Sequence, residues 1–385
     1  MKKEVFYLGQ YSPVQNPRNL KVFPSAITKM DYIKSALKRA NIKVKIISLA
    51  ETSNITFCYF SRKHIEVDEL ESVSYINTFG GPTVVMKLFS RTWTLIQLLH
   101  FLLFRIKETD KLLVYHTLVY SWPIKIARSL RNMNIYFEVE ELYHAVRKSS
   151  EYKRRREKQY LAKASGYILV NDLIAESCGF INKPIAVCYG DYRYYVRNLK
   201  RTDDGYIHLV YAGLIDSDGG DVSLAVDTMT YLPDKYILHV LGYGQPKSIQ
   251  LLNARINSIN LRLQRKAILY HGCLTGEDYY YLLSNCDFGL CPRALPDEQS
   301  DYTFPSKVLV YLGCRLTPVC TPIAAVMHST VSNFVVFSKG FDAESIADCL
   351  LSPTQISAPD PVELLSKMDK DFTKSLPSLF NLCKE

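Results

Sequence analysis

The sequence contains no pair of cysteines with C-x-x-C spacing, although ten cysteines are spread over its 385 residues. Several of them lie inside apolar runs, so we expect reduced core residues rather than a disulfide framework or a zinc site. No apolar run reaches the ~18–20 residues that a membrane-spanning helix needs, and even residues 94–104 are interrupted by Gln97 and His100. The first residues hold too short an apolar run for a signal peptide. We therefore expect a cytoplasmic protein without a transmembrane segment.

Glycine and proline are few, at 17 residues each, and no segment repeats along the chain. These two absences exclude collagen-like, low-complexity and solenoid proteins. The H-E-x-x-H spacing of many zinc enzymes is also absent, so we expect no metal ion and no other bound cofactor. The chain does contain 48% hydrophobic and 22% charged residues, which is the composition of an ordinary folded protein.

The net charge of +9 is distributed unevenly. Residues 1–200 carry 32 basic and 17 acidic residues, a balance of +15, whereas residues 201–385 carry 15 and 21, a balance of −6. The basic half predicts an anionic partner, such as a membrane surface or a phosphorylated substrate, although random drift of surface charge explains it equally well. Nucleic acid is not expected as a partner, because no helix-turn-helix, RNP or zinc-finger pattern accompanies the basic residues.

Strand and helix signals alternate along the whole chain. Apolar runs such as residues 112–115 (LLVY) and 167–170 (YILV) are typical of strands that are buried on both faces of a parallel sheet. The alternation favours the α/β fold class, with two Rossmann-like, doubly wound domains that face each other across a cleft. We place these domains at residues 1–195 and 200–365, and a C-terminal helix that can return to the first domain at 366–385.

The predicted elements are bounded by residue numbers as follows. In the first domain we expect strands at 4–9, 44–49, 56–60, 111–116, 134–140, 166–170 and 185–189, and helices at 25–40, 83–106, 121–131, 150–164 and 171–178. In the second domain we expect strands at 207–212, 236–241, 267–271, 288–291, 317–320 and 334–337, and helices at 221–231, 248–263, 276–285 and 305–313.

Glycines and a short basic segment follow the predicted strands of the second half. Strand-end glycines let a backbone approach a ligand, and the N–H groups of a following helix attract anions. The ordered set Tyr211-Ala-Gly213, Leu241-Gly-Tyr-Gly244, Tyr270-His-Gly272, 281–287 (YLLSNCD), 304–312 (FPSKVLVYL) and 318–321 (PVCT) resembles the C-terminal domain of GT-B-fold glycosyltransferases. The resemblance covers residues 207–330 and is nearest to the family 4-like enzymes of bacterial capsule and exopolysaccharide synthesis.

That resemblance implies a nucleotide-diphosphate sugar held by the second domain and a glycan or lipid-linked glycan acceptor held by the first. The donor-binding residues that it implies are Gly213, Gly242, Gly244, His271, Arg293, Glu298, Tyr302, Thr303, Phe304, Pro305, Ser306 and Lys307. The residues around Pro305 support it independently, since proline suits a first helical turn and the turn's N–H groups, with Lys307 and Arg293, suit a diphosphate. The alternative is that Ser306 only caps a helix and Lys307 is a surface charge.

Two departures from the family pattern concern the donor. Many family 4-like enzymes carry two glutamates at the positions that are here Tyr302 and Val310, and the second of them usually grips the ribose. Residues 214–220 also contain no cation. Either the donor is held differently, with Asp297, Glu298 or Asp301 as substitutes, or donor binding is weakened or lost.

In the first half, acidic residues follow a predicted strand. Clustered carboxylates raise each other's pKa and act as a general base or anchor a hydroxyl, which makes Glu140 and Glu141 our candidates for the acceptor-side base. The equally weighted alternative is that Glu138 and Glu140 lie on one solvated face of an edge strand. His116 is a second catalytic candidate, although a lone strand-end histidine is more often packed. The resemblance adds Gly9, Arg18 and His144 as acceptor-binding residues.

The helix predicted at residues 83–106 is hydrophobic on all sides, and the simplest interpretation is a buried helix. The alternative is insertion at a membrane interface, helped by Arg91, Arg105, Lys107 and the basic run at 153–156. Taken together, the sequence predicts a glycosyltransferase of surface polysaccharide synthesis, in possible peripheral contact with the plasma membrane through its basic half. A nucleotide-sugar epimerase of the same architecture, or a catalytically silent binding or scaffold protein, remains open.

Overall fold

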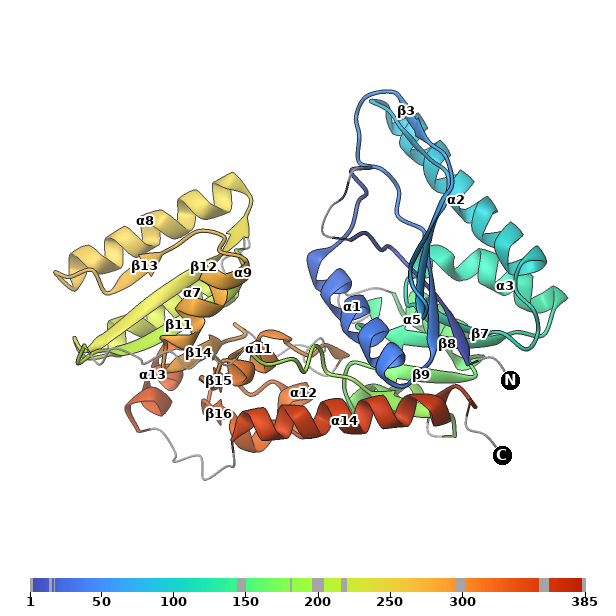
Figure 1. The fold of residues 1–385 in the computed structure, drawn as a ribbon. Helices are drawn as coiled ribbons and strands as arrows, with labels where there is room; N and C mark the ends of the chain where they lie inside the picture. Colours follow the sequence, from blue (N-terminus) through green and yellow to red (C-terminus); the bar gives the residue numbers. More distant parts are fainter. Residues whose placement is uncertain are drawn as a thin grey trace. The chain divides into compact units, whose positions relative to one another are not determined.

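The computed structural model describes residues 3–13, 16, 18–143, 150–180, 182–195, 204–215, 220–294, 302–352 and 360–382. The chain divides into two compact units (Figure 1). Unit 1 comprises Met1–Gly190 together with Lys370–Glu385, and unit 2 comprises Asp191–Asp369. Helix α14 (Pro361–Leu379) therefore begins in unit 2 and ends in unit 1.

Unit 1 is built on an eight-stranded sheet in the order β10-β9-β8-β7-β1-β2-β5-β4. Strand β4 runs antiparallel to β5, and the other neighbours run parallel. The strands are β1 (Glu4–Gly9), β2 (Lys43–Ser48), β4 (Lys63–Asp68), β5 (Glu71–Tyr75), β7 (Lys111–Tyr115), β8 (Asn134–Val139), β9 (Gly166–Leu169) and β10 (Ile185–Val187). The helices are α1 (Pro24–Arg39), α2 (Val84–Phe104), α3 (Ser121–Leu130), α5 (Glu151–Ala162) and α6 (Leu173–Cys178). A separate antiparallel pair joins β3 (Cys58–Phe60) to β6 (Thr78–Gly80).

The middle strands of this sheet are buried on both faces, as their continuous apolar runs predict. Leu112, Leu113 and Val114 of β7 are all 1% exposed or less. The sequence pattern did not predict β4, β5 or β6. Strand β4 is mostly exposed, so its conformation depends on pairing with β5, which lies later in the chain.

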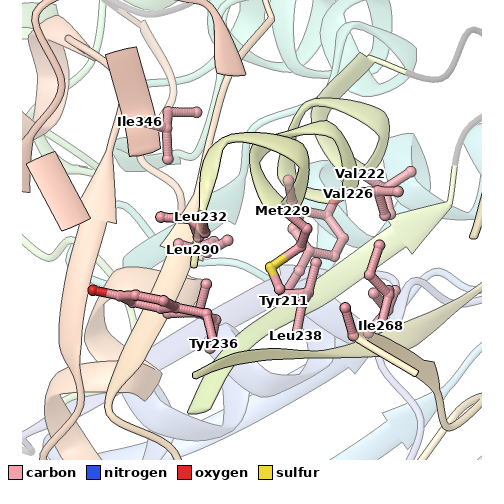
Figure 2. Packing of buried hydrophobic residues seen from close by; sticks show 14 of the residues in the cluster. Tyr211, Val222, Val226, Met229, Leu232, Tyr236, Leu238, Ile268, Leu290 and Ile346 are labelled. Atoms are coloured by element: carbon pink, nitrogen blue, oxygen red, sulfur yellow. The ribbon is translucent and has the colours of Figure 1, made fainter. Parts of the chain in front are cut away.

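Unit 2 is built on a six-stranded sheet in the order β13-β12-β11-β14-β15-β16, in which all neighbours run parallel. The strands are β11 (Ile207–Ile215), β12 (Tyr236–Gly244), β13 (Ile268–Tyr270), β14 (Phe288–Cys291), β15 (Thr317–Cys320) and β16 (Val336–Phe337). The helices are α7 (Gly220–Thr228), α8 (Pro246–Arg262), α9 (Gly276–Ser284), α11 (Lys307–Gly313), α12 (Ala324–Met327) and α13 (Ala343–Leu351). Helix and sheet side chains interdigitate beside Tyr211 in a core that includes Met229 and Leu238 (Figure 2).

Each sheet has a point at which the chain reverses its direction of travel across the strands. In unit 1 the strands run outward from β1 to β2 and then restart on the other side with β7, and in unit 2 they restart with β14 beside β11. The loops that leave the two strands at such a switch point diverge, which opens a crevice beyond their carboxyl ends where open α/β sheets bind ligands. We therefore expect ligands beyond the carboxyl ends of β1 and β7 in unit 1, and beyond those of β11 and β14 in unit 2.

Helix α2 corrects one expectation. It spans nearly the range predicted, but the interpretation as a buried helix is wrong for its first half, where Val84, Val85, Leu88 and Phe89 are exposed. Within the described part of the chain, no helix has the length and apolar character needed to span a membrane.

Candidate functional site

Lys307 lies at the switch point of unit 2. It begins α11, and its Nζ atom lies 4.2 Å from the centroid of the Tyr211 ring on β11. A Cβ atom built on Gly213, two residues further along β11, would lie 3.1 Å from the same Nζ atom. The ammonium group is therefore placed at the carboxyl end of β11, beside β14, where the topology predicts an anionic ligand.

The surroundings of Lys307 keep it charged. Burial disfavours the ammonium form, but Tyr211, Cys291 and Asp221 favour it more strongly, so the pKa of Lys307 is raised above its ordinary value. Asp221 lies in the first turn of α7, at the loop that leaves β11. The interpretation of Lys307 as a mere surface charge does not fit a partly buried side chain that packs on an aromatic ring.

Tyr311, one turn after Lys307, holds the two switch-point strands together. Its hydroxyl accepts a hydrogen bond from the Ala212 N–H (3.0 Å) and donates one to the Leu290 carbonyl (3.2 Å). A Cβ on Gly289 would collide with the Tyr311 ring, so glycine is needed there for the ring to pack against β14. Tyr311 thus fixes the start of α11, and with it Lys307, to both strands; it is fully buried and was not among the predicted site residues.

The residues before Lys307 differ from the expected helix start. Helix α11 begins at Lys307, with Ser306 as N-cap, so Pro305 precedes the helix instead of lying in its first turn. Ser306 is exposed and makes no side-chain capping bond, which argues against a capping role. Thr303 is partly buried, whereas Tyr302 and Phe304 are 8% and 7% exposed. The side chains of Tyr302 and Phe304 are therefore packed against the protein and anchor the segment that precedes Lys307.

The strand-end glycines have different roles. A Cβ on Gly242 would collide with the carbonyl oxygen of Gly213, and one on Gly244 with that of Ile215. These two glycines are therefore required by the close approach of β12 to β11, whose register pairs Gly242 with Gly213. Gly213 is the one whose missing side chain leaves room beside Lys307.

His271, which directly follows β13, belongs to a row of three histidines with His239 of β12 and His208 of β11. Its Nε2 lies 2.9 Å from His239 Nδ1, and His239 Nε2 lies 2.8 Å from His208 Nδ1. Burial lowers the pKa of His239 to about 4, helped by repulsion from His271, and burial also lowers the pKa of His271. His271 is therefore a neutral group in a hydrogen-bonded row at neutral pH, and its donor-binding role stays a prediction.

Arg293 follows β14 and is the second cation near the switch point. Its backbone N–H donates to Thr321 Oγ1 (2.8 Å), and its charge acts on Cys291. Arg293 is partly buried. Glu298, with Asp297 and Asp301, lies outside the described residues. Val310, at the other position where the family has glutamate, is partly buried in α11.

In unit 1, Glu138 and Glu140 belong to a buried cluster at the carboxyl end of β8. Glu138 is fully buried and accepts a hydrogen bond from the hydroxyl of Tyr7 on β1. Lys29 of α1 pairs with Glu140, with 3.1 Å between Nζ and Oε1. The expectation of a solvated face on an edge strand is therefore wrong, because β8 lies between β7 and β9.

This cluster distributes its charge unequally. Burial, strengthened by repulsion from Glu140, raises the pKa of Glu138 to about 8. Burial disfavours the charge on Lys29, but Cys188, Glu140 and Glu138 outweigh it and raise the pKa of Lys29. The Glu140 side chain is 23% exposed, whereas Glu138 is 0% exposed. Glu140 is thus the carboxylate that an acceptor can reach.

His116 follows β7, at the other strand of the unit 1 switch point, but it is packed inside the unit. Its Nε2 lies 3.4 Å from Glu157 Oε1, and each of these two side chains is 1% exposed. Its Nδ1 lies 3.3 Å from the backbone oxygen of Glu141, a partly buried residue. This geometry supports the packed interpretation of His116. His144 lies outside the described residues.

Gly9 and Arg18 both follow β1, yet neither is placed as an open ligand group. A Cβ on Gly9 would lie 2.7 Å from Met30 Cε, so glycine here permits α1 to pack closely on the sheet. The Arg18 guanidinium lies over the rings of Tyr75 (5.3 Å) and Phe60 (5.7 Å). One of its nitrogens, Nη1, is buried without a hydrogen-bond partner among the described residues. Acceptor binding by both residues stays a prediction.

Metal ligands do not gather in the described residues: no group of three His, Cys, Asp or Glu side chains is close enough to hold an ion. The sequence does contain D-x-D spacing at Asp216–Asp218 and Asp369–Asp371. The first of these pairs lies outside the described residues, and nothing places a cation at the second.

Solved structures resemble the whole chain, although no protein-family model matches it and no curated protein matches its sequence. A trehalose-phosphate synthase (UDP-forming) of Burkholderia vietnamiensis is 11% identical, with a TM-score of 0.66 and 100% of both chains covered. HepE of Anabaena, solved in complex with UDP, is 12% identical, with a TM-score of 0.64 and coverage of 98% of this chain and 100% of that one. A sucrose-phosphate synthase of Thermosynechococcus elongatus is 13% identical, with a TM-score of 0.64 and coverage of 99% and 96%. The predicted fold class is confirmed: this chain has the Rossmann-like, two-domain α/β architecture of GT-B proteins.

Proposed function

We propose that the protein is a glycosyltransferase that takes a sugar from a nucleotide diphosphate. The observation that carries this proposal is the charged Lys307 at the carboxyl end of β11, packed on Tyr211 and opposite a glycine that leaves space beside it. A diphosphate is the anion that such a position suits, because both the topology and the charge favour it. Solved structures of the same fold are described as UDP-forming synthases or as complexes with UDP, which supports the same donor class.

In the proposed reaction, the bond between the sugar's anomeric carbon and the diphosphate oxygen breaks, and a bond to an acceptor hydroxyl oxygen forms. The hydroxyl proton passes to a base, and the departing nucleotide diphosphate keeps the bonding electron pair. Lys307 and Arg293 would stabilise that growing negative charge. Because Lys307 already packs on Tyr211 before the reaction, it lowers the barrier with little reorganisation.

On the acceptor side we propose Glu140 as the group that orients or deprotonates the hydroxyl. Its carboxylate is partly exposed and is paired with the ammonium group of the buried Lys29. We further propose that the acceptor is a glycan or lipid-linked glycan in surface polysaccharide synthesis, and that the enzyme works in peripheral contact with a membrane. This finer assignment rests on the family 4-like motif resemblance and on the basic first half of the chain.

A ligand-dependent melting experiment tests the donor site. UDP- and GDP-sugars should raise the melting temperature, whereas a CMP-sugar, which carries a single phosphate, should raise it less. Lys307→Ala should weaken UDP-sugar binding roughly 10- to 100-fold, as expected for a lost charge-assisted hydrogen bond. Lys247→Ala is the matched control, since Lys247 is an exposed lysine of the same unit.

Lys307 also packs on Tyr211, so folding must be checked separately. Lys307→Arg keeps the charge and should restore part of the affinity, and circular dichroism should show the same fold for all variants. Unchanged affinity in Lys307→Ala would remove the diphosphate role. Stabilisation by no nucleotide sugar would favour a catalytically silent binding protein, and donor turnover without any acceptor would favour an epimerase.

A further inference from the structure

Unit 1 exposes a compact group of large apolar side chains, which we call the apolar tip. It consists of Ile55, Phe57 and Tyr59 around β3, and Val84, Val85, Leu88 and Phe89 in the first two turns of α2. Each of these side chains is more than half exposed, up to 76% for Phe57 and 80% for Val84. Figure 1 shows β3 beside the start of α2 at one end of unit 1, and α2 packs on β6, the partner of β3.

In the first half of α2, polar side chains face the protein and large apolar side chains face solvent. This is the reverse of what is expected for a helix that only covers its own domain. Ser90 and Thr94 are 3% and 2% exposed, whereas the neighbouring Leu88 and Phe89 are 64% and 54% exposed. Surface helices normally turn their apolar stripe toward the core and their polar residues outward. A contiguous apolar patch that the protein leaves outside marks a binding surface.

Aromatic contacts and a helix cap hold the apolar tip in a defined conformation. Phe79 of β6 contacts three of the surrounding rings, with centroid distances of 4.9 Å to Tyr59, 5.4 Å to Phe89 and 6.4 Å to Trp93. Thr83 caps α2 by accepting a hydrogen bond from the Met86 N–H (3.2 Å). These contacts hold both segments of the tip in fixed positions, so the apolar side chains are presented together.

The charges within and beside the tip segments are basic. Residues 52–63 and 82–94 contain no Asp or Glu but contain Arg62, Lys63, Lys87 and Arg91. All four cations are exposed. Glu51 precedes the first of these segments, and its Oε1 lies 3.9 Å from Arg91 Nε. Apolar and aromatic side chains flanked by cations match a surface that is anionic outside and apolar inside.

We propose that the apolar tip docks on a lipid bilayer that carries anionic headgroups, with its apolar side chains in the acyl boundary and its cations at the lipid phosphates. The proposal rests on the membrane contact proposed above and names the surface that makes it. It is tested separately from the transfer reaction, because vesicle binding is measured without any nucleotide sugar. A second copy of this chain would bring like charges together.

The test is co-sedimentation of the full-length chain with vesicles of phosphatidylcholine, with or without phosphatidylglycerol. The chain should bind the anionic vesicles and lose binding in high salt. Phe57→Ser combined with Val85→Ser should weaken binding at least tenfold, and Lys87→Gln combined with Arg91→Gln should weaken it roughly fivefold for each charge removed. The replaced side chains are exposed, so these variants should keep their melting temperature.

Matched controls lie in unit 2. Leu251→Ser with Leu261→Ser removes two side chains of α8 that are 54% and 81% exposed, and Lys247→Gln with Lys266→Gln removes two exposed charges. These controls should bind vesicles as the unaltered chain does. Absence of vesicle binding, or equal binding by the tip variants and the controls, would overturn the proposal. So would a dimer, seen by light scattering, that the tip variants disrupt while vesicle binding is unaffected.

Discussion

Glu138 is a carboxylic acid that is neutral at pH 7 because it is buried beside Glu140. Its pKa is about 8 in the folded chain against 4.5 for an ordinary glutamate. The folded state therefore binds more protons than the unfolded state between these values. By linkage, the free energy of unfolding should fall as the pH rises from about 5 to 8, by at most about 1.4 kcal/mol per pH unit for one proton.

The variant Glu138→Gln should remove this fall, because an amide keeps the shape of the protonated acid but does not titrate. Urea unfolding at pH 5, 6, 7 and 8 would measure it. Glu176→Gln, at an exposed residue of α6 in the same unit, is the control and should keep the slope of the unaltered chain. An identical pH slope in Glu138→Gln would show that another group titrates.

Tyr311 connects the strands at the unit 2 switch point through one hydroxyl. Tyr311→Phe should destabilise unit 2 by about 1–3 kcal/mol, because the Ala212 N–H and the Leu290 carbonyl both lose a buried partner. Thermal unfolding checks the stability, and nucleotide binding checks whether Lys307, one turn earlier, has moved. Tyr281→Phe serves as the control, since Tyr281 is exposed on α9. Full stability in Tyr311→Phe would argue against the bridge.

At the scale of residues, the sequence predicted which residue types form the site better than it predicted which residues contact them. Lys307 was predicted from the proline and serine before it, and it lies where an anion is expected. Tyr311 and Asp221 were missed, because a tyrosine inside an apolar helix reads as core and an aspartate at a helix start reads as a cap. Glu138 was misplaced on an edge strand, because the position of a strand within a sheet depends on partners distant in sequence.

At the scale of elements, β11 and β12 approach each other more closely than ordinary side chains permit. Gly242→Ala should destabilise unit 2 by on the order of 1–3 kcal/mol, because the new methyl would meet the Gly213 carbonyl, which is backbone and cannot rotate away. Differential scanning calorimetry measures the change. In Gly220→Ala, the control, the methyl would lie 3.6 Å from Ala294 Cβ, so no loss is expected. Equal stability of both variants would contradict the packing role.

Most elements were predictable from their apolar period, and the exceptions share a cause. Helix α1 and strand β1 were found within one residue of their predicted ends, because their patterns are strong and local. Strands β4, β5 and β6 were not predicted, since the exposed β4 adopts its conformation through pairing with β5. The outward face of α2 was missed because composition does not reveal which side of a helix meets the protein.

At the scale of the whole molecule, α14 crosses from unit 2 into unit 1. Phe380, just after the helix, packs on Tyr136 of β8 with 4.7 Å between ring centroids, and Phe372 stacks on Tyr32 of α1 at 5.8 Å. Phe380→Ala should therefore destabilise unit 1 by about 3–5 kcal/mol. Hydrogen exchange should show lost protection in β8 with unchanged protection in β12. Lys374→Ala, at an exposed position of the same helix, should change neither, and a loss spread equally over both units would contradict the assignment.

The architecture was the most predictable level. Alternation of strands and helices indicated two doubly wound domains, and the fold agrees with solved structures that share only 11–13% of their residues with this chain. Two sequences this different can share one pattern of buried and exposed positions, because different apolar side chains can fill the same core. The charged partners of the site come from segments distant in the sequence, as Lys29 and Glu140 do, so the site was less predictable than the fold.

The path of the last helix has a consequence for how the protein is made. Because Lys370–Glu385 belong to unit 1, the core of that unit stays incomplete while the ribosome synthesises all of Asp191–Asp369. Unit 2, whose sequence is contiguous, can finish folding first. Tyr136 and Tyr32 stay exposed until Phe380 and Phe372 have been synthesised and pack on them. A stalled or truncated nascent chain would therefore expose an aromatic surface of the kind that chaperones bind.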